Sequence, residues 1–277
     1  MGPQDIALAI IGEVFDRGYV KNKVMEFVGP GVANLSVDYR IGVDVMTTET
    51  TCLSSIWRTD DKVREYYDIH GRVEEYRELN PADVTYYDGM IEINLDESQA
   101  HDCQPSIPAT PIHRGAERES DGYSGRLREA GEGQPGRSGG VYPEGQSAQR
   151  KTLCGSGNHC RCAGGGYENI TDAADILRGT SIGADEFTLS VYPASTPIYM
   201  QLVKNGCVAD LMETGAIVKT AFCGPCFGAG DTPSNNGFSI RHSTRNFPNR
   251  RSKLQNGQIS SVALMDARSI AATAANK

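Results

Sequence analysis

Apolar residues in the first 95 positions alternate between helical and strand spacing, a pattern typical of an α/β protein. Ile6, Ile10 and Val14 recur at helical spacing after Asp5, a candidate N-cap, and Gly18 ends this predicted helix. The same reasoning predicts further helices opening near residues 36 and 59. Strands are predicted at 24–28, 50–57 and 91–95.

In residues 98–161 the apolar positions follow neither helical nor strand spacing. The stretch is rich in Gly, Ser, Arg, Pro and Gln and contains no Phe, Met or Trp. Such a composition cannot bury a core of its own, and a linker of this length inside a compact domain is unusual. We therefore predict a first part of an α/β/α domain at 1–97, a disordered low-complexity insert at 98–161, and a second part of that domain at 162–277.

The regular pattern returns at residue 162. Thr171 is a candidate cap for a short helix, and Ser195, followed by Thr and Pro, opens a helix that Gly206 ends. Strands are predicted at 187–191 and 216–222, and an Ala-rich helix at 260–274.

Composition then narrows the class of protein. A hydrophobic fraction of 39% with 22% charged residues is typical of a soluble globular chain. The net charge of -8 lacks the basic signature of a nucleic-acid binder. No apolar run approaches the roughly 20 residues that cross a bilayer, and no basic region precedes the apolar start. We expect a cytoplasmic protein that contacts neither nucleic acid nor membrane.

Eight cysteines without a secretion signal favour metal or redox chemistry over a disulfide framework. Only Cys223 and Cys226 have tight ligand spacing, and their Cys-Gly-Pro-Cys sequence is also the dithiol motif of thioredoxin-like redox proteins. The following residues, 227–233, resist helix formation, whereas the redox motif needs a helix there. A glycine-rich loop instead allows thiolates and backbone N–H groups to converge on an iron–sulfur cluster.

A cluster with three protein thiolates leaves one iron open to substrate. Cys162 is the best candidate for the third thiolate because it begins a second glycine-rich loop, with Cys160 and Cys154 as alternatives. Cys52 and Cys207 fit better as core thiols.

Together these motifs resemble the aconitase family of hydro-lyases. The resemblance covers roughly residues 5–95 and 162–277 in the right order, and block 222–250 is most similar to bacterial aconitase-like hydratases of unassigned substrate. The matching blocks are Glu26-Phe27 before Gly29-Pro30-Gly31, Glu49 downstream, the Cys162 loop ending in Tyr167-Glu168, Cys223-Gly224-Pro225-Cys226, and Arg245-Asn246-Phe247-Pro248-Asn249-Arg250.

The resemblance implies a three-layer α/β/α fold and an iron–sulfur hydro-lyase. By this resemblance Cys162, Cys223 and Cys226 hold a 4Fe-4S cluster. Its fourth iron would bind the hydroxyl and carboxylate of a small hydroxy tricarboxylate or dicarboxylate.

The resemblance also assigns the substrate contacts. Arg245 and Arg250 would grip carboxylates as bidentate forks. Glu49 matches the family's catalytic carboxylate beside the open iron. Thr244 stands where many aconitases have Asn, so one hydrogen bond to substrate is expected to differ.

Each assignment has an alternative. Arg245 and Arg250 also fit a basic surface stretch, and Glu49 also fits a solvent-exposed carboxylate at a helix end. His242 and His159 are interpreted as non-catalytic. The alternative functions are a thiol–disulfide redox module that uses Cys223 and Cys226, and a non-catalytic fragment.

Dehydration also needs a base. In the family, His and Asp side chains come from a domain before residue 5, and a Ser with further Arg residues from a domain after residue 277. We therefore expect little or no dehydratase activity from the isolated chain, with the missing domains supplied by another chain. The abrupt loss of spacing at 98–161 further suggests a reading-frame change between two compensating indels.

Overall fold

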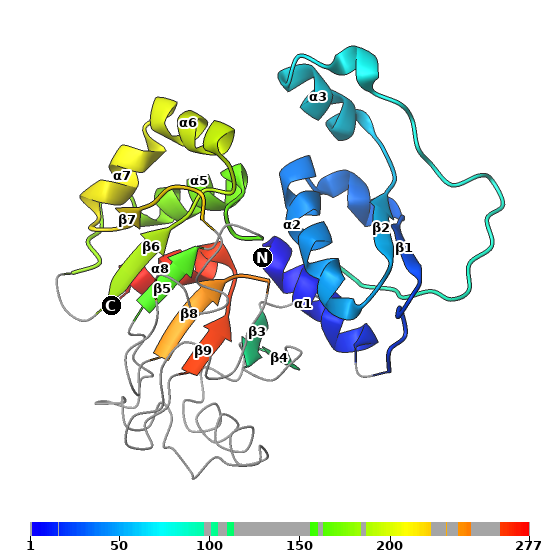
Figure 1. Cartoon of the computed structure of the whole chain (residues 1–277), viewed down its shortest axis with the longest axis horizontal. Coiled ribbons are helices and arrows are strands. Elements are labelled where there is room, and N and C mark those ends of the chain that lie inside the picture. The colour runs from blue at the N-terminus through cyan, green and yellow to red at the C-terminus, as the bar shows by residue number, and fades with distance from the viewer. Residues whose placement is uncertain are drawn as a thin grey trace, which may run out of the picture.

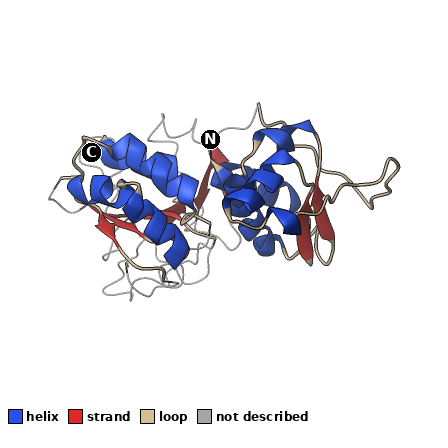
Figure 2. Ribbon diagram, turned by 90° about the horizontal axis from the view of Figure 1, so that it is seen from above, coloured by secondary structure: helices blue, strands red, loops and turns tan. Residues whose placement is uncertain are grey.

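The computed structural model describes residues 2–15, 17–96, 101–104, 110–113, 156–159, 163–183, 187–222, 231, 238–244 and 261–276. Within these ranges no helix is both long and apolar enough to span a membrane. The described elements form two neighbouring parts, one around α1 to α3 and one around a large sheet (Figure 1). The N-terminal end lies between the two parts when the molecule is seen from above (Figure 2).

The first part consists of three helices, three 3-10 turns and two strands. β1 and β2 pair in parallel, with Val24 opposite Ser54 and Phe27 opposite Trp57. Its elements are α1 (Pro3–Val14), β1 (Val24–Phe27), η1 (Pro30–Asn34), α2 (Val37–Thr47), η2 (Thr48–Thr50), β2 (Ser54–Trp57), α3 (Asp61–Ile69) and η3 (Val73–Glu75).

Local capping explains where these helices begin. Ser36 Oγ accepts a hydrogen bond from the Tyr39 backbone N–H at 3.1 Å, as expected for the N-cap of α2. Asp60 caps α3 through the Val63 N–H at 3.2 Å. The prediction for α1 was wrong by three residues, because Gly2 is the N-cap and the Asp5 carboxylate accepts the Gly2 N–H at 2.9 Å.

The apolar stripe of α1 is buried as predicted, and Ile6, Ile10 and Val14 share a cluster with Val43 of α2. The predicted strand at 91–95 is wrong. Its alternating apolar side chains pack against this cluster, but the segment is irregular and pairs with none of the strands that the structure describes. Alternation there reflects one-sided packing rather than sheet hydrogen bonding.

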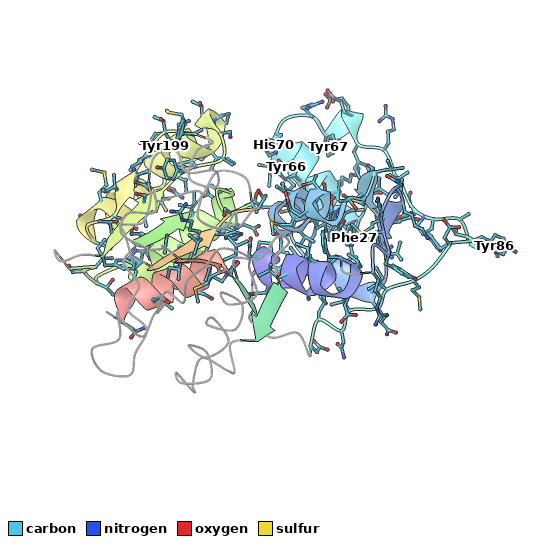
Figure 3. All side chains as sticks on the ribbon, turned by 60° about the horizontal axis from the view of Figure 1, so that its bottom comes forward. Phe27, Tyr66, Tyr67, His70, Tyr86 and Tyr199 are labelled. Carbon is cyan, nitrogen blue, oxygen red and sulfur yellow. The ribbon has the colours of Figure 1, made fainter. Side chains whose placement is uncertain are left out.

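Helix α3 buries none of its residues. Its aromatic side chains contact one another instead, with the Tyr66 and His70 ring centroids 4.3 Å apart (Figure 3). The following extended stretch is also exposed, and Tyr86 projects from it (Figure 3).

The second part is built on a seven-stranded sheet with the order β4-β3-β9-β8-β5-β6-β7. β5 to β9 run parallel, and β3 with β4 forms an antiparallel hairpin at one edge. The strands are β3 (His101–Gln104), β4 (Thr110–His113), β5 (Ser156–His159), β6 (Thr188–Val191), β7 (Ile217–Val218), β8 (Phe238–His242) and β9 (Ser261–Leu264).

Helices contact both faces of this sheet. On one face, Leu189, Ile240 and Ala263 share a core with residues of α5 (Tyr167–Leu177), α6 (Thr196–Lys204), α7 (Cys207–Glu213) and α8 (Ala267–Ala275). On the other face, Leu264 packs with Leu8 and Ile11 of α1 and with Met46 of α2. This arrangement of helices on parallel strands confirms the predicted α/β class.

Several boundaries differ from the sequence predictions. Three strands, β3, β4 and β5, lie within 98–161, where the residue pattern predicted none. Thr171 lies inside α5, whose N-cap is Gly166. The predicted helix at 260–274 begins only at Ala267, because β9 occupies its first residues, and α7 was not predicted. The three-part division of the chain stays a prediction.

Candidate active site at the carboxyl edge of the large sheet

Neighbouring strands β8, β5, β6 and β7 are parallel, so their carboxyl ends lie along one edge of the sheet. Three of these ends lead into the predicted motifs. β5 ends three residues before Cys162, β7 ends five residues before Cys223, and β8 ends two residues before Thr244. Ligands of open α/β sheets bind outside the carboxyl ends of the strands. The topology therefore brings the approaches to all three motifs to one edge.

The structure describes two of the predicted site residues, Glu49 and Thr244, and both are half-buried. The other predicted site residues are followed through their described neighbours in the chain. Consecutive Cα atoms lie about 3.8 Å apart, so Ala163, Phe222 and Thr244 show where the chain enters or leaves three of the motifs. The predicted site residues outside the described ranges are Cys162, Cys223, Cys226, Arg245 and Arg250.

The turn that follows Cys162 packs tightly against two strand ends. A Cβ added to Gly164 would lie 2.7 Å from Cγ of His242, the last residue of β8. A Cβ on Gly165 would lie 2.6 Å from the carbonyl oxygen of Tyr192, the residue after β6. The Ala194 N–H also donates to the Gly165 carbonyl at 2.8 Å. Only glycine fits at either position, so the turn is fixed on these two strand ends.

The approach to the third motif reaches the same place. Phe222 immediately precedes Cys223, and its ring centroid lies 6.5 Å from that of Tyr192. Tyr192 is thus shared by the Gly165 turn and by the chain entering the Cys223 motif. The residues flanking Cys162, Cys223 and Arg245 converge at the ends of β6 and β8.

Helix α2 approaches the same turn and carries the chain toward Glu49. A Cβ on Gly42 would lie 3.8 Å from the Ala163 carbonyl oxygen, and Met46 shares an apolar cluster with Ala163. Glu49 lies one turn beyond Met46, in η2. The structure therefore brings the helix that leads to Glu49 to the turn after Cys162.

Hydrogen bonds join the first turns of α2 and α5. The Glu168 N–H donates to Asp38 Oδ2 at 2.8 Å, and Ser36 Oγ donates to the Glu168 carboxylate. Burial raises the pKa of Asp38, while the hydrogen bond from Glu168 lowers it. Because α5 follows the Cys162 turn directly, this contact ties the turn to the first part of the chain.

A buried polar network supports the turn from the helix face of the sheet. Asn169 donates to the Ala163 carbonyl at 3.1 Å and accepts from Arg268 at 3.4 Å. Arg268 pairs with Asp266, the N-cap of α8. His242 is fully buried, and burial lowers its pKa to about 4, although Asp266 opposes this effect.

Sequence reasoning noticed His242 but missed Asp266, although an Asp before an Ala-rich run is an N-cap signal. His242 and Asp266 lie 24 positions apart, and only the pairing of β8 with β9 brings them together. The core-thiol interpretation of Cys207 is confirmed, because the residue is buried within the main cluster. Cys52 is half-buried and donates to the Thr47 carbonyl at 3.4 Å.

Metal ligation by the described residues alone is not supported, since no three of their His, Cys, Asp or Glu side chains gather as a metal site. Glycines 164 and 165 let the main chain of this turn approach the ends of β6 and β8 closely, which brings the residue next to Cys162 to the carboxyl edge of the sheet.

Fold and site together define an α/β protein with a candidate site at the carboxyl edge of a parallel sheet. The model of the aconitase family (aconitate hydratase) matches residues 1–272, and the chain belongs to this family.

Two similar proteins illustrate the relationship. The 3-isopropylmalate dehydratase large subunit of Clostridium beijerinckii is 29% identical over 225 residues, which are 81% of this chain and 45% of that protein. The 2,3-dimethylmalate dehydratase large subunit of Eubacterium barkeri is 28% identical over 225 residues, 81% of this chain and 46% of that protein. The chain thus spans about half the length of these relatives.

Proposed function

We propose that this chain supplies the cluster- and substrate-binding domain of an iron–sulfur hydro-lyase. Its reaction would be the reversible removal of water from a small hydroxy acid with two or three carboxylates. The observation that carries the proposal is the convergence at Tyr192 and His242 of the chain segments flanking Cys162, Cys223 and Arg245. Family membership and two dehydratase relatives support the same reaction class.

In this proposal Cys162, Cys223 and Cys226 hold a 4Fe-4S cluster. Three thiolates leave one iron with an open position, and when bound the cluster supplies a Lewis acid for the departing hydroxyl. The turn at Gly164 and Gly165 supports the assignment, since Ala163, the neighbour of Cys162, begins a turn that packs against the ends of β6 and β8.

The remaining proposed residues act on the substrate. Arg245 and Arg250 would bind carboxylates through paired N–H donors and orient the hydroxyl-bearing carbon. Thr244, half-buried two residues after β8, would offer a hydroxyl where many family members offer an amide. Glu49 would orient the leaving hydroxyl or the water that replaces it.

The names of the relatives suggest the substrate type and a partner. Both are large subunits, and both act on substituted malates. We propose a hydroxy dicarboxylate of the malate type as substrate, and a second polypeptide that completes the site. We also propose that the enzyme works in the cytoplasm.

Anaerobic reconstitution with iron and sulfide tests this function. We expect a brown protein with broad visible absorption, whose reduced-cluster EPR spectrum changes when a substituted malate is added. Arg245→Met should keep the colour and abolish the substrate-induced change, because it removes only the carboxylate contact.

Two controls complete the test. Cys207→Ser changes a core thiol and should retain the absorption. A colourless protein that reduces insulin disulfides would refute the proposal and establish the redox alternative.

A further inference from the structure

Asp231 is held by partners that lie within, or directly after, three strands. Its carboxylate accepts from Lys219 Nζ at 2.6 Å and from the Tyr192 hydroxyl at 2.5 Å. Its backbone carbonyl accepts from the Arg241 guanidinium at 2.7 Å. These partners follow β6, follow β7 and lie within β8, so Asp231 is fixed to the same sheet that carries the candidate site.

The three side chains form a closed hydrogen-bonded triangle. Lys219 Nζ also donates to the Tyr192 hydroxyl at 3.1 Å and lies 5.2 Å from the centre of the Tyr192 ring. Burial opposes ionisation of Asp231, but hydrogen bonds from Lys219, Tyr192 and Ser190 outweigh it and lower the pKa of this carboxyl. The triangle is therefore a charged and satisfied contact with Tyr192 buried beneath it.

The triangle joins two positions that flank the Cys223 and Cys226 motif. Lys219 lies four residues before Cys223, and Asp231 lies five residues after Cys226. The ion pair therefore joins the two ends of the segment that carries both cysteines. Loop ends held together lose the freedom to separate, which restricts the positions available to residues between them.

We propose that Tyr192, Lys219 and Asp231 are positioning residues that clasp this segment and hold Cys223 and Cys226 at the spacing a cluster needs. The inference rests on the proposed cluster function and extends it to three residues to which that function gives no role. Tyr192 also contacts Gly165, so one residue would relate the Cys162 turn to the segment with the other two cysteines.

Thiol reactivity in the cluster-free protein tests the clasp directly. Alkylation of Cys223 and Cys226 by iodoacetamide, followed by peptide mass spectrometry, should accelerate about fivefold in Lys219→Met and Asp231→Asn, as expected from losing a partly exposed ion pair. Lys219→Arg should restore most of the slow rate because it keeps the charge. Cys207 is an internal reference, since burial raises its pKa to about 11.

Arg178→Met is the matched control. It breaks an exposed ion pair with Asp210, between α5 and α7, and should leave the alkylation of Cys223 and Cys226 unchanged within about twofold. Equal acceleration in this control, or unchanged rates in Lys219→Met and Asp231→Asn, would overturn the clasp. If one of these variants fails to fold, Tyr192→Phe takes its place, because it removes only a hydroxyl. Faster alkylation of Cys223 and Cys226 in Tyr192→Phe would support the clasp, and an unchanged rate would overturn it.

Iron retention separates the two proposals. In the reconstituted protein, the clasp variants should lose iron to a chelator faster than the wild type and Arg178→Met. If the wild type binds no iron, the cluster proposal fails, whereas the alkylation rates still decide whether the clasp exists. If the wild type binds iron and all variants lose it equally, the clasp fails and the cluster proposal stands.

Discussion

Gly165→Ala tests how rigidly the Cys162 turn is fixed at the sheet edge. The new Cβ would lie 2.6 Å from the Tyr192 carbonyl oxygen, 2.7 Å from the Ala194 nitrogen and 3.1 Å from the Ala194 Cα. All three are backbone atoms, so no rotamer change relieves the contact. The methyl group would also disturb the hydrogen bond from the Ala194 N–H to the Gly165 carbonyl.

The expected cost follows from these contacts. Overpacking a rigid site typically costs about 1–3 kcal/mol. At about 2–4 °C of melting temperature per kcal/mol for a domain of this size, we expect a fall of roughly 2–12 °C, measured by thermal unfolding. Because the turn must move away from Tyr192, iron bound after reconstitution should also fall.

Gly31→Ala is the matched control. Its Cβ would approach the Leu95 Cδ1 at 2.9 Å, the free end of a flexible side chain, so a small rotation accommodates it. The melting temperature should change by less than about 2 °C. A Gly165→Ala protein as stable and as iron-loaded as Gly31→Ala would refute the fixed turn.

Three further predictions concern other parts of the chain. His242 becomes protonated near pH 6.5 in the unfolded protein but only near pH 4 in the folded protein. Lowering the pH across this window should therefore reduce the free energy of unfolding by up to about 3 kcal/mol. In urea unfolding, His242→Gln should remove this pH dependence. Arg40→Met should cost about 3–5 kcal/mol, because buried Arg40 bonds the Val32 and Leu35 carbonyls and pairs with Asp60 at 2.5 Å. Translating the gene's other two frames across 98–161 should give an apolar, periodic sequence, since polar β5 occupies a central parallel position where apolar strands are usual.

Each of these three predictions has a result that would contradict it. A pH slope unchanged in His242→Gln would show that another group titrates in that window. Arg40→Lys should recover only part of the loss, and full recovery would argue against the multiple carbonyl contacts. Two polar, aperiodic alternative frames would end the reading-frame hypothesis.

Local signals predicted much of the fold. Ser36 and Ser195 act as N-caps where the sequence indicated, and Asp60 caps α3 one residue after the predicted opening near residue 59, because a cap depends on residues within one turn. The strand prediction at 91–95 failed because apolar alternation reports one-sided burial, whether or not a partner strand exists. The Ala-rich stretch at 260–274 hid β9, since the helix propensity of its many alanines is a stronger local signal than the short strand-forming run Val262, Ala263 and Leu264.

The candidate site was predictable only in part. Its cysteine and arginine motifs follow from local sequence, and they stay predictions because they lie outside the described residues. The supporting groups could not be found this way. His242 lies near Asp266 because the parallel strands β8 and β9 bring distant positions together, and Lys219 pairs with Asp231 twelve positions further along the chain. No local pattern encodes either contact.

We propose that cysteines from two separate loops share one cluster at the carboxyl edge of the sheet. Native mass spectrometry of the anaerobically reconstituted chain measures this directly, by counting iron and sulfide in the wild type and in Cys162→Ser, Cys223→Ser and Cys226→Ser. We expect one four-iron, four-sulfide cluster in the wild type and its loss or conversion in each variant. An intact cluster in Cys162→Ser, or none in the wild type, would contradict it.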